Sequence, residues 1–215
     1  MTPNLVLFDC DGVIVDSEPV ASDVLLDDLR AFGLKMTRRE SHDLFKGGTF
    51  KSAGEEARRR GADVPDDWAD SFYPKLYDVL GHGVPLIPGF VALLDEIEAA
   101  GIPTGIVSNG SIEKMAITLT PHGLFDRFEG RMFSAYTYGV SKPDPELVLI
   151  AARHFDVAPE RTAFVDDSRS GCKAGQAAHM VTIGFAADAP RDVLEPHCTH
   201  VVTAMSEIAT LLDLP

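Results

Sequence analysis

Residues 5–12 have the sequence Leu-Val-Leu-Phe-Asp-Cys-Asp-Gly, and this stretch decides the fold. Four consecutive apolar residues, Leu5 to Phe8, are typical of a short strand buried on both faces. The polar residues Asp9 to Gly12 form the turn that ends it. A strand of this kind belongs in a parallel sheet with helices on both sides, so the pattern predicts an α/β protein.

The segment that follows this turn is expected to be helical throughout. Apolar residues recur at helical spacing from Val20 to Phe32, and Thr37-Arg38-Arg39-Glu40 has the form of a capping box that opens a second helix. That helix should end at Gly47-Gly48. A third helix is expected over about 49–60 and a fourth, bearing an apolar stripe, begins at Trp68. Residues 17–83 are therefore predicted to form an inserted all-helical cap domain.

After Pro85 the pattern alternates between strands and helices, which indicates βαβ units and a doubly wound, Rossmann-like parallel sheet. The core domain should therefore comprise residues 1–16 and 84–215. The expected helices are 90–100, 112–120, 145–155 and 170–178, and the expected strands are 102–107, 132–133, 162–165 and 181–185, followed by a weaker strand and helix at the end of the chain.

Charge and composition exclude several classes of protein. The 215 residues include 19 Lys and Arg and 33 Asp and Glu, giving a net charge of −14, which disfavours nucleic-acid and membrane-surface binding. Residues 1–9 have no basic segment, and no stretch approaches the roughly 18 apolar residues of a membrane span. Three widely spaced cysteines, Cys10, Cys172 and Cys198, argue against a disulfide framework. We expect a cytoplasmic protein.

Polar side chains follow four of the predicted strands or open the helices after them. Ligands of a parallel sheet bind beyond the carboxyl ends of its strands, so these groups should converge. Acids packed together repel unless a cation lies among them, and oxygen-only ligands favour Mg²⁺. Taken singly, the later motifs could also be helix caps or a solvated lysine. The converging residues are Asp9, Asp11, Ser108, Asn109, Lys142, Asp166 and Asp167.

Four segments together resemble the haloacid dehalogenase-like hydrolase superfamily, in its branch with a helical cap inserted after the first strand. They are Phe8-Asp9-Cys10-Asp11-Gly12, Ser108-Asn109-Gly110, Ser141-Lys142-Pro143-Asp144-Pro145 and Val165-Asp166-Asp167-Ser168, and they extend over almost the whole chain in the family's order. The first, second and fourth of these segments, together with Phe45-Lys46-Gly47, are most similar to those of sugar-phosphate and 6-phosphogluconate phosphatases, and less similar to those of phosphoglycolate phosphatases.

The resemblance implies hydrolysis of a small phosphorylated metabolite through an aspartyl-phosphate. Asp9 would be the nucleophile, and Asp11 would move protons and also bind Mg²⁺ through its backbone carbonyl. Asp9 and Asp167 would bind the metal directly, and Asp166 would act on it directly or through water. Ser108, the Asn109 amide and Lys142 would hold the phosphoryl group, and the cap loop with Lys46 and Gly47 would contact the organic part. No organic cofactor is implied, and the chain should be a monomer or weak homodimer.

Several alternatives remain open at this stage. Dehalogenation is disfavoured because dehalogenases of the family lack the second acid, which here is Asp11. A β-phosphoglucomutase-like mutase would carry a histidine at the position of Ala21 and an arginine at the position of Phe50. A phosphoacceptor of signalling type would need neither the cap nor Asp11, and a non-catalytic binding protein would not need every catalytic position to be filled.

Overall fold

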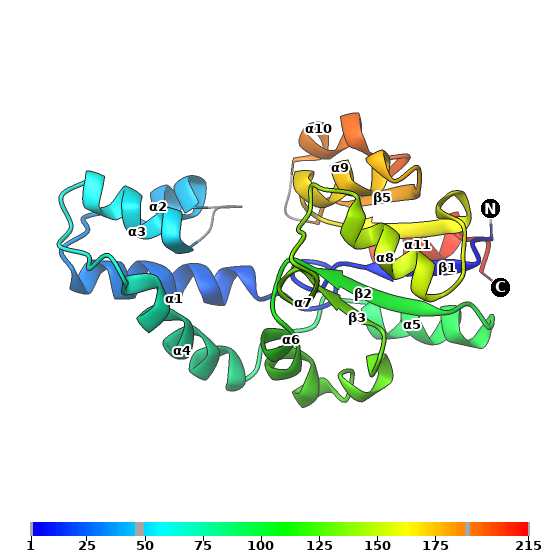
Figure 1. The fold of residues 1–215 in the computed structure, drawn as a ribbon, viewed down its shortest axis with the longest axis horizontal. Coiled ribbons are helices and arrows are strands. Elements are labelled where there is room, and N and C mark those ends of the chain that lie inside the picture. Colours follow the sequence, from blue (N-terminus) through cyan, green and yellow to red (C-terminus); the bar gives the residue numbers. More distant parts are fainter. Residues whose placement is uncertain (1, 46–49, 188–189, 215) are drawn as a thin grey trace. The chain divides into compact units, whose positions relative to one another are not determined.

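The central strand of the structure is β1 (Leu5–Phe8), whose four residues are all buried. A computed structural model describes residues 2–45, 50–187 and 190–214 (Figure 1). The chain divides into two compact units, one made of Met1–Asp16 with Pro85–Pro215 and the other of Ser17–Val84. The first unit contains the sheet and the second is helical.

Six strands form one parallel sheet in the order β3-β2-β1-β4-β5-β6. This is the doubly wound order, in which the chain leaves β1 and its neighbour β4 in opposite directions. Phe8 of β1 lies opposite Ile106 and Val165, so Asp9 comes level with Asp166 at one edge of the sheet. The predicted α/β class is confirmed. The other strands are β2 (Thr104–Ser108), β3 (Met132–Ser134), β4 (Thr162–Asp166), β5 (Val181–Phe185) and β6 (His200–Val202).

Helices cover both faces of this sheet (Figure 1). On one face, Leu5 and Leu7 pack in a buried cluster with Leu147 and Ala174 from α8 and α9. On the other face, Phe8 meets Phe90 of α5 edge to face, with ring centroids 5.2 Å apart. The helices are α5 (Phe90–Ala99), α6 (Ile112–Leu119), α7 (Ala135–Tyr138), α8 (Glu146–His154), α9 (Arg169–Ala177), α10 (Arg191–Leu194) and α11 (Met205–Leu211), with 3₁₀ turns η1 (Thr120–His122), η2 (Asp126–Phe128), η3 (Pro159–Arg161) and η4 (Glu195–His197).

The strand β2 begins two residues later than the apolar run suggested. The amide of Ile102 donates to the carbonyl of Ile97 (3.1 Å) and so closes the end of α5. Pro103 has no amide hydrogen, although its carbonyl accepts from Val6 (3.0 Å). Regular pairing therefore starts at Thr104.

The helical unit contains α1 (Glu18–Ala31), α2 (Arg38–Phe45), α3 (Phe50–Arg59) and α4 (Trp68–Gly81). The predicted capping box is present, because the Thr37 amide donates to Glu40 Oε2 (2.8 Å) and the Glu40 amide to Thr37 Oγ1 (3.3 Å). Trp68 is buried, and its Nε1 donates to Asp28 Oδ2 (2.7 Å). The expected helix end at Gly47-Gly48 lies outside the described residues.

The unit boundary after the helices differs by one residue from the expected one. Residue 84 was expected in the core, whereas Val84 lies in the helical unit. The reason is that pairing with the first segment begins only at Pro85, whose carbonyl accepts from the Asp16 amide (2.8 Å), and continues with a bridge between Val15 and Leu86.

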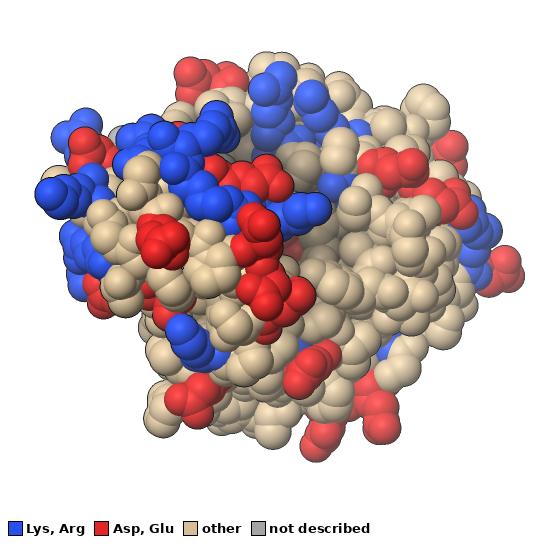
Figure 2. Space-filling model, turned by 60° about the vertical axis from the view of Figure 1, so that its left-hand side comes forward, with Lys and Arg blue, Asp and Glu red and all other residues tan. Residues whose placement is uncertain are grey.

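Figure 2 shows charged side chains of both signs interspersed with uncharged residues on the face that it draws. Within the described part of the chain, every helix is too short or too polar to cross a bilayer.

Candidate active site

Asp9 lies immediately beyond β1, where the chain passes from the buried strand into the polar turn. Its residue surface is 8% exposed, and its Oδ1 accepts a hydrogen bond from the Cys10 amide (2.7 Å). Burial raises the pKa of Asp9 to about 7, with Asp166 and Asp11 adding to the rise and Lys142 opposing it. A carboxylate in this setting is held in place and poorly hydrated.

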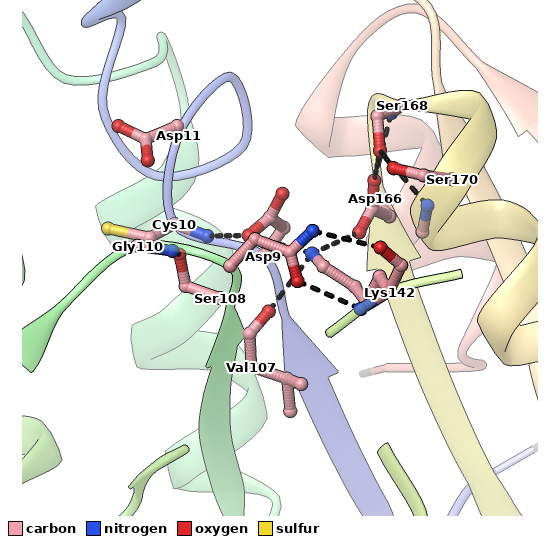
Figure 3. Close-up of polar contacts among 12 residues, drawn as sticks. Asp9, Cys10, Asp11, Val107, Ser108, Gly110, Lys142, Asp166, Ser168 and Ser170 are labelled. Atoms are coloured by element: carbon pink, nitrogen blue, oxygen red, sulfur yellow. Dashed lines mark hydrogen bonds and ion pairs between the residues drawn. The ribbon is translucent and has the colours of Figure 1, made fainter. Parts of the chain in front are cut away.

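Lys142 connects the two acids that flank the centre of the sheet (Figure 3). Its Nζ lies 3.0 Å from Asp9 Oδ1 and 2.7 Å from Asp166 Oδ2, and it also donates to the carbonyl of Val107 (3.1 Å). Burial disfavours the ammonium, but Asp166 and Asp9 outweigh that effect and hold the pKa of Lys142 above its ordinary value. Lys142 is therefore a permanently charged cation inside the protein.

The side chain of Asn109 fixes the backbone of Lys142. Its Nδ2 donates to the Lys142 carbonyl (3.1 Å), and its Oδ1 accepts from the Lys142 amide (2.9 Å). The sequence motif indicated a role only for the backbone amide of Asn109, so this role of the side chain is one that the motif does not predict. No pattern in the sequence pairs residues 33 positions apart.

Asp166 ends β4 and is completely buried. Besides the contact with Lys142, its Oδ1 accepts from the Ser168 amide (2.8 Å) and hydroxyl (2.6 Å). Ser168 in turn caps α9 by accepting from the Gly171 amide (3.0 Å). Gly171 leaves room for this acid, because a Cβ at that position would overlap the Asp166 carboxylate. Both oxygens of Asp166 are thus engaged by the protein.

Asp9, Asp166 and Asp167 each offer one carboxylate oxygen within 4.8 Å of the others. Gly12, with φ of +77°, leaves space for Asp167, since a Cβ there would overlap the Asp167 carboxylate. The single ammonium of Lys142 does not balance three carboxylates, so the cluster favours a further cation, and its oxygen-only character fits Mg²⁺. The assignment of a metal-binding role to the backbone of Asp11 stays a prediction.

Ser108 ends β2 and is buried, and its Oγ accepts from the Gly110 amide (2.9 Å). The turn is held further by Ser134, whose hydroxyl donates to the Gly110 carbonyl (2.6 Å). Ser111 then caps α6. The structure therefore places the Ser108 hydroxyl at the same edge of the sheet as Asp9.

Asp11 forms an ion pair that the sequence analysis did not foresee. Lys114, in the first turn of α6, places its Nζ 2.8 Å from Asp11 Oδ1. Burial disfavours the charge of Lys114, but Asp11 overrides this effect and raises the pKa of the lysine. A single lysine in a helix carries no sequence signal of such a contact.

Two other expectations concern Cys10 and the predicted cap loop. The Cys10 thiol is buried as predicted, and burial together with Asp11 and Asp9 raises its pKa well above the ordinary value, so it is unsuited to nucleophilic work. Lys46 and Gly47 lie outside the described residues.

This arrangement has the groups that phosphoryl transfer requires. It combines a buried carboxylate, a buried cation in contact with it, a hydroxyl on the neighbouring strand end, a second carboxylate two residues on, and an acidic cluster that fits a divalent cation. Phosphoryl transfer depends chiefly on positioning and charge stabilisation, which these groups can supply.

Comparison with known proteins agrees with this chemistry. A family model for haloacid dehalogenase-like hydrolases matches residues 3–179. The 6-phosphogluconate phosphatase of Escherichia coli K12 is 31% identical over 97% of this chain and 93% of its own length, and hexitol phosphatase A of the same organism is 28% identical over 86% and 85%. A hydrolase from Deinococcus radiodurans, solved with bound phosphate and sodium, has a TM-score of 0.83 and 27% identity over 98% of this chain and 95% of its own.

Proposed function

Because this chain belongs to the haloacid dehalogenase-like hydrolase family, we propose that it is a Mg²⁺-dependent phosphatase that acts on a small sugar phosphate or phosphorylated sugar acid. The observation that carries the proposal is the buried contact of Lys142 with both Asp9 and Asp166 at the carboxyl end of the sheet. The two phosphatase relatives, which extend over most of the chain, support the substrate class.

The first half of the reaction would transfer the phosphoryl group to Asp9. A carboxylate oxygen of Asp9 attacks phosphorus while the bond from phosphorus to the leaving oxygen breaks. Asp11 gives a proton to that oxygen, so that an alcohol departs rather than an alkoxide. Lys142 neutralises charge on Asp9 and on the phosphoryl oxygens, and Ser108 donates a hydrogen bond to one of them.

The second half would hydrolyse the aspartyl-phosphate. Asp11, now ionised, takes a proton from water as the water oxygen attacks phosphorus, and Asp9 is released as a carboxylate together with inorganic phosphate. Asp9, Asp167 and Asp166 would hold the Mg²⁺, which supplies a positive charge that offsets the negative charge of the phosphoryl group. Asp167 is the proposed direct ligand among the paired acids, because Lys142 and Ser168 occupy both oxygens of Asp166.

One observation in the helical unit supports hydrolysis over a mutase reaction. The mutase alternative expected a cationic side chain at the position that Phe50 occupies. Phe50 instead packs edge to face against Phe72 and Tyr73, with ring centroids at 4.9 Å and 5.3 Å, and so contributes to the interior of that unit. The proposal also places the protein in the cytoplasm, as a monomer or weak homodimer, in keeping with its three free thiols.

The proposal is tested by measuring inorganic phosphate released from 6-phosphogluconate, glucose 6-phosphate, sorbitol 6-phosphate and phosphoglycolate, with and without Mg²⁺. We expect Mg²⁺-dependent release, greatest for one of the sugar derivatives. Sodium borohydride reduces an acyl phosphate to an alcohol, so treatment during turnover should convert Asp9 to homoserine, as detected by peptide mass spectrometry. Turnover without any reducible adduct would contradict the covalent mechanism, and absence of turnover on all four would contradict the substrate class.

A further inference from the structure

The two lysines near β1 serve different acids. Lys142 contacts Asp9 and Asp166, whereas Lys114 contacts Asp11. In Figure 3, Asp11 is drawn on one side of Asp9, and Lys142 with Asp166 on the other. The acid proposed to attack and the acid proposed to move protons are therefore contacted by separate lysines from separate segments of the chain.

Hydrogen bonds fix the backbone of Lys114 at the start of α6. Its amide donates to Ser111 Oγ (3.1 Å), the cap of α6, and its carbonyl accepts from Thr118 Oγ1 (3.1 Å) one turn later. The Lys114 and Asp11 side chains are 21% and 26% exposed. This ion pair is more sheltered from water than an ordinary surface pair, and screening by solvent weakens it less.

The backbone of Asp11 is also fixed, which leaves rotation of its side chain as the remaining freedom. The Gly12 amide donates to the Val15 carbonyl (2.8 Å), and Asp11 forms a bridge with Val15. Lys114 binds one oxygen, Oδ1, and thereby limits that rotation. The other oxygen, Oδ2, and the Ser108 hydroxyl both lie next to Gly110. The position that a Cβ of residue 110 would occupy is 3.8 Å from Oδ2 and 3.2 Å from Ser108 Oγ.

We propose that Lys114 is a positioning residue for proton transfer: its ammonium holds Oδ1 of Asp11, so that Oδ2 is the oxygen that gives the proton to the leaving group. This inference rests on the proposed function. Asp11 enters this step as the neutral acid, with its proton on Oδ2 and with Oδ1 accepting from the Lys114 ammonium. When the bond from phosphorus to the leaving oxygen breaks, its electron pair stays on that oxygen, which takes the proton from Oδ2. Asp11 is then an anion, and Lys114 stabilises the charge that has developed on it.

The test compares two leaving groups. A general acid speeds the departure of a poor leaving group, such as an alkoxide, and hardly changes the departure of a good one. The two substrates are the alkyl phosphate that the wild type hydrolyses best, beginning with 6-phosphogluconate, and 2,4-dinitrophenyl phosphate. The variants are Lys114→Met, which keeps the aliphatic stem, and Lys114→Arg, which keeps the charge. The value measured is kcat/KM, which reports steps up to departure of the leaving group.

We expect Lys114→Met to lower kcat/KM for the alkyl phosphate by about 10- to 100-fold, a part of the 10²- to 10⁴-fold that a general acid contributes. The value for 2,4-dinitrophenyl phosphate should change less than about threefold, since that leaving group needs no proton. Lys114→Arg should recover most of the alkyl rate. Equal losses on both substrates, or a faster alkyl reaction, would overturn the inference.

A double-mutant cycle tests whether Lys114 acts through Asp11. In an Asp11→Asn background, Lys114→Met should lower the alkyl rate by less than about twofold, because the group it positions is gone. If Lys114→Met lowers kcat/KM by the same factor in the Asp11→Asn background as in the wild type, the inference is overturned. Lys75→Met is the matched control, since Lys75 also forms an ion pair with an aspartate, Asp28 in the helical unit (2.5 Å), and should leave the ratio of the two substrates unchanged.

The result separates this inference from the proposed function. An active wild type with equal losses in Lys114→Met overturns only the role of Lys114. A wild type that releases phosphate from neither class of substrate overturns the proposed function and the inference with it.

Discussion

Gly171→Ala should destabilise the protein, although alanine is ordinarily the better helix residue. Gly171 lies in the first turn of α9, and a Cβ there would overlap the carboxylate of Asp166. A surface side chain would swing away at little cost. Asp166 cannot, because it is fully buried and held by Ser168 and Lys142.

The size of the effect follows from two opposing contributions. Breaking a buried ion pair costs about 3–5 kcal/mol, since the remaining charge is left without its partner. Replacing a glycine inside a helix by alanine gains about 1 kcal/mol. The difference predicts a net loss of about 2–4 kcal/mol in the free energy of unfolding. Because displaced Asp166 no longer holds Lys142, phosphatase activity should also fall, by about 100-fold or more.

Urea unfolding followed by circular dichroism measures the stability change, and phosphate release measures the activity. A second variant isolates the cause: in an Asp166→Ala background the obstructing carboxylate is absent, so Gly171→Ala should stabilise the protein by about 1 kcal/mol. If Gly171→Ala is as stable and active as the wild type, or if it destabilises the Asp166→Ala background equally, the steric argument is wrong.

Four other predictions concern catalysis and packing. Asp9→Asn should lower phosphate release by several orders of magnitude in a folded protein, checked by mass spectrometry against deamidation, because an amide does not attack phosphorus. Asp167→Ala should raise the Mg²⁺ concentration for half-maximal activity more than Asp166→Ala does; a metal titration with the larger shift for Asp166 would reverse the assignment. Phosphorus NMR should show inorganic phosphate but no interconversion of glucose 1- and 6-phosphates, even with a bisphosphate primer; isomer appearing first would indicate a mutase. Trp68→Phe should cost about 1.5–3 kcal/mol in urea unfolding, because the Nε1 bond to the Asp28 carboxylate is lost, while kcat stays unchanged.

The sheet could be predicted from sequence because its strands are short, apolar and bounded by turns. β5 (Val181–Phe185) has the expected limits, and β4 extends only one residue further than expected, to Asp166. Right-handed crossovers limit the possible orders of the strands but do not select one, so the order comes from the structure. The start of β2 was predicted two residues too early. Ile102 is apolar like a strand residue, but its amide closes the end of α5 instead.

The acids and Lys142 could be located because each belongs to a short local motif. The groups that orient them could not, since they depend on contacts between segments far apart in the chain. Asn109 reaches the backbone of Lys142, and Lys114 reaches Asp11 across 103 residues. A lysine in the first turn of a helix and an asparagine in a turn are ordinary surface residues until the fold brings their partners to them.

The insertion of the helical unit between β1 and β2 imposes an order of assembly during synthesis. β1 is made first, yet its partners are Thr104–Ser108 and Thr162–Asp166, so this wholly apolar strand emerges from the ribosome long before it can pair. Ser17–Val84, whose contacts are local, can fold in the meantime. The buried apolar residues of β1 therefore stay without their strand partners while the helical unit is made, and the charged cluster is complete only when β4 adds Asp166.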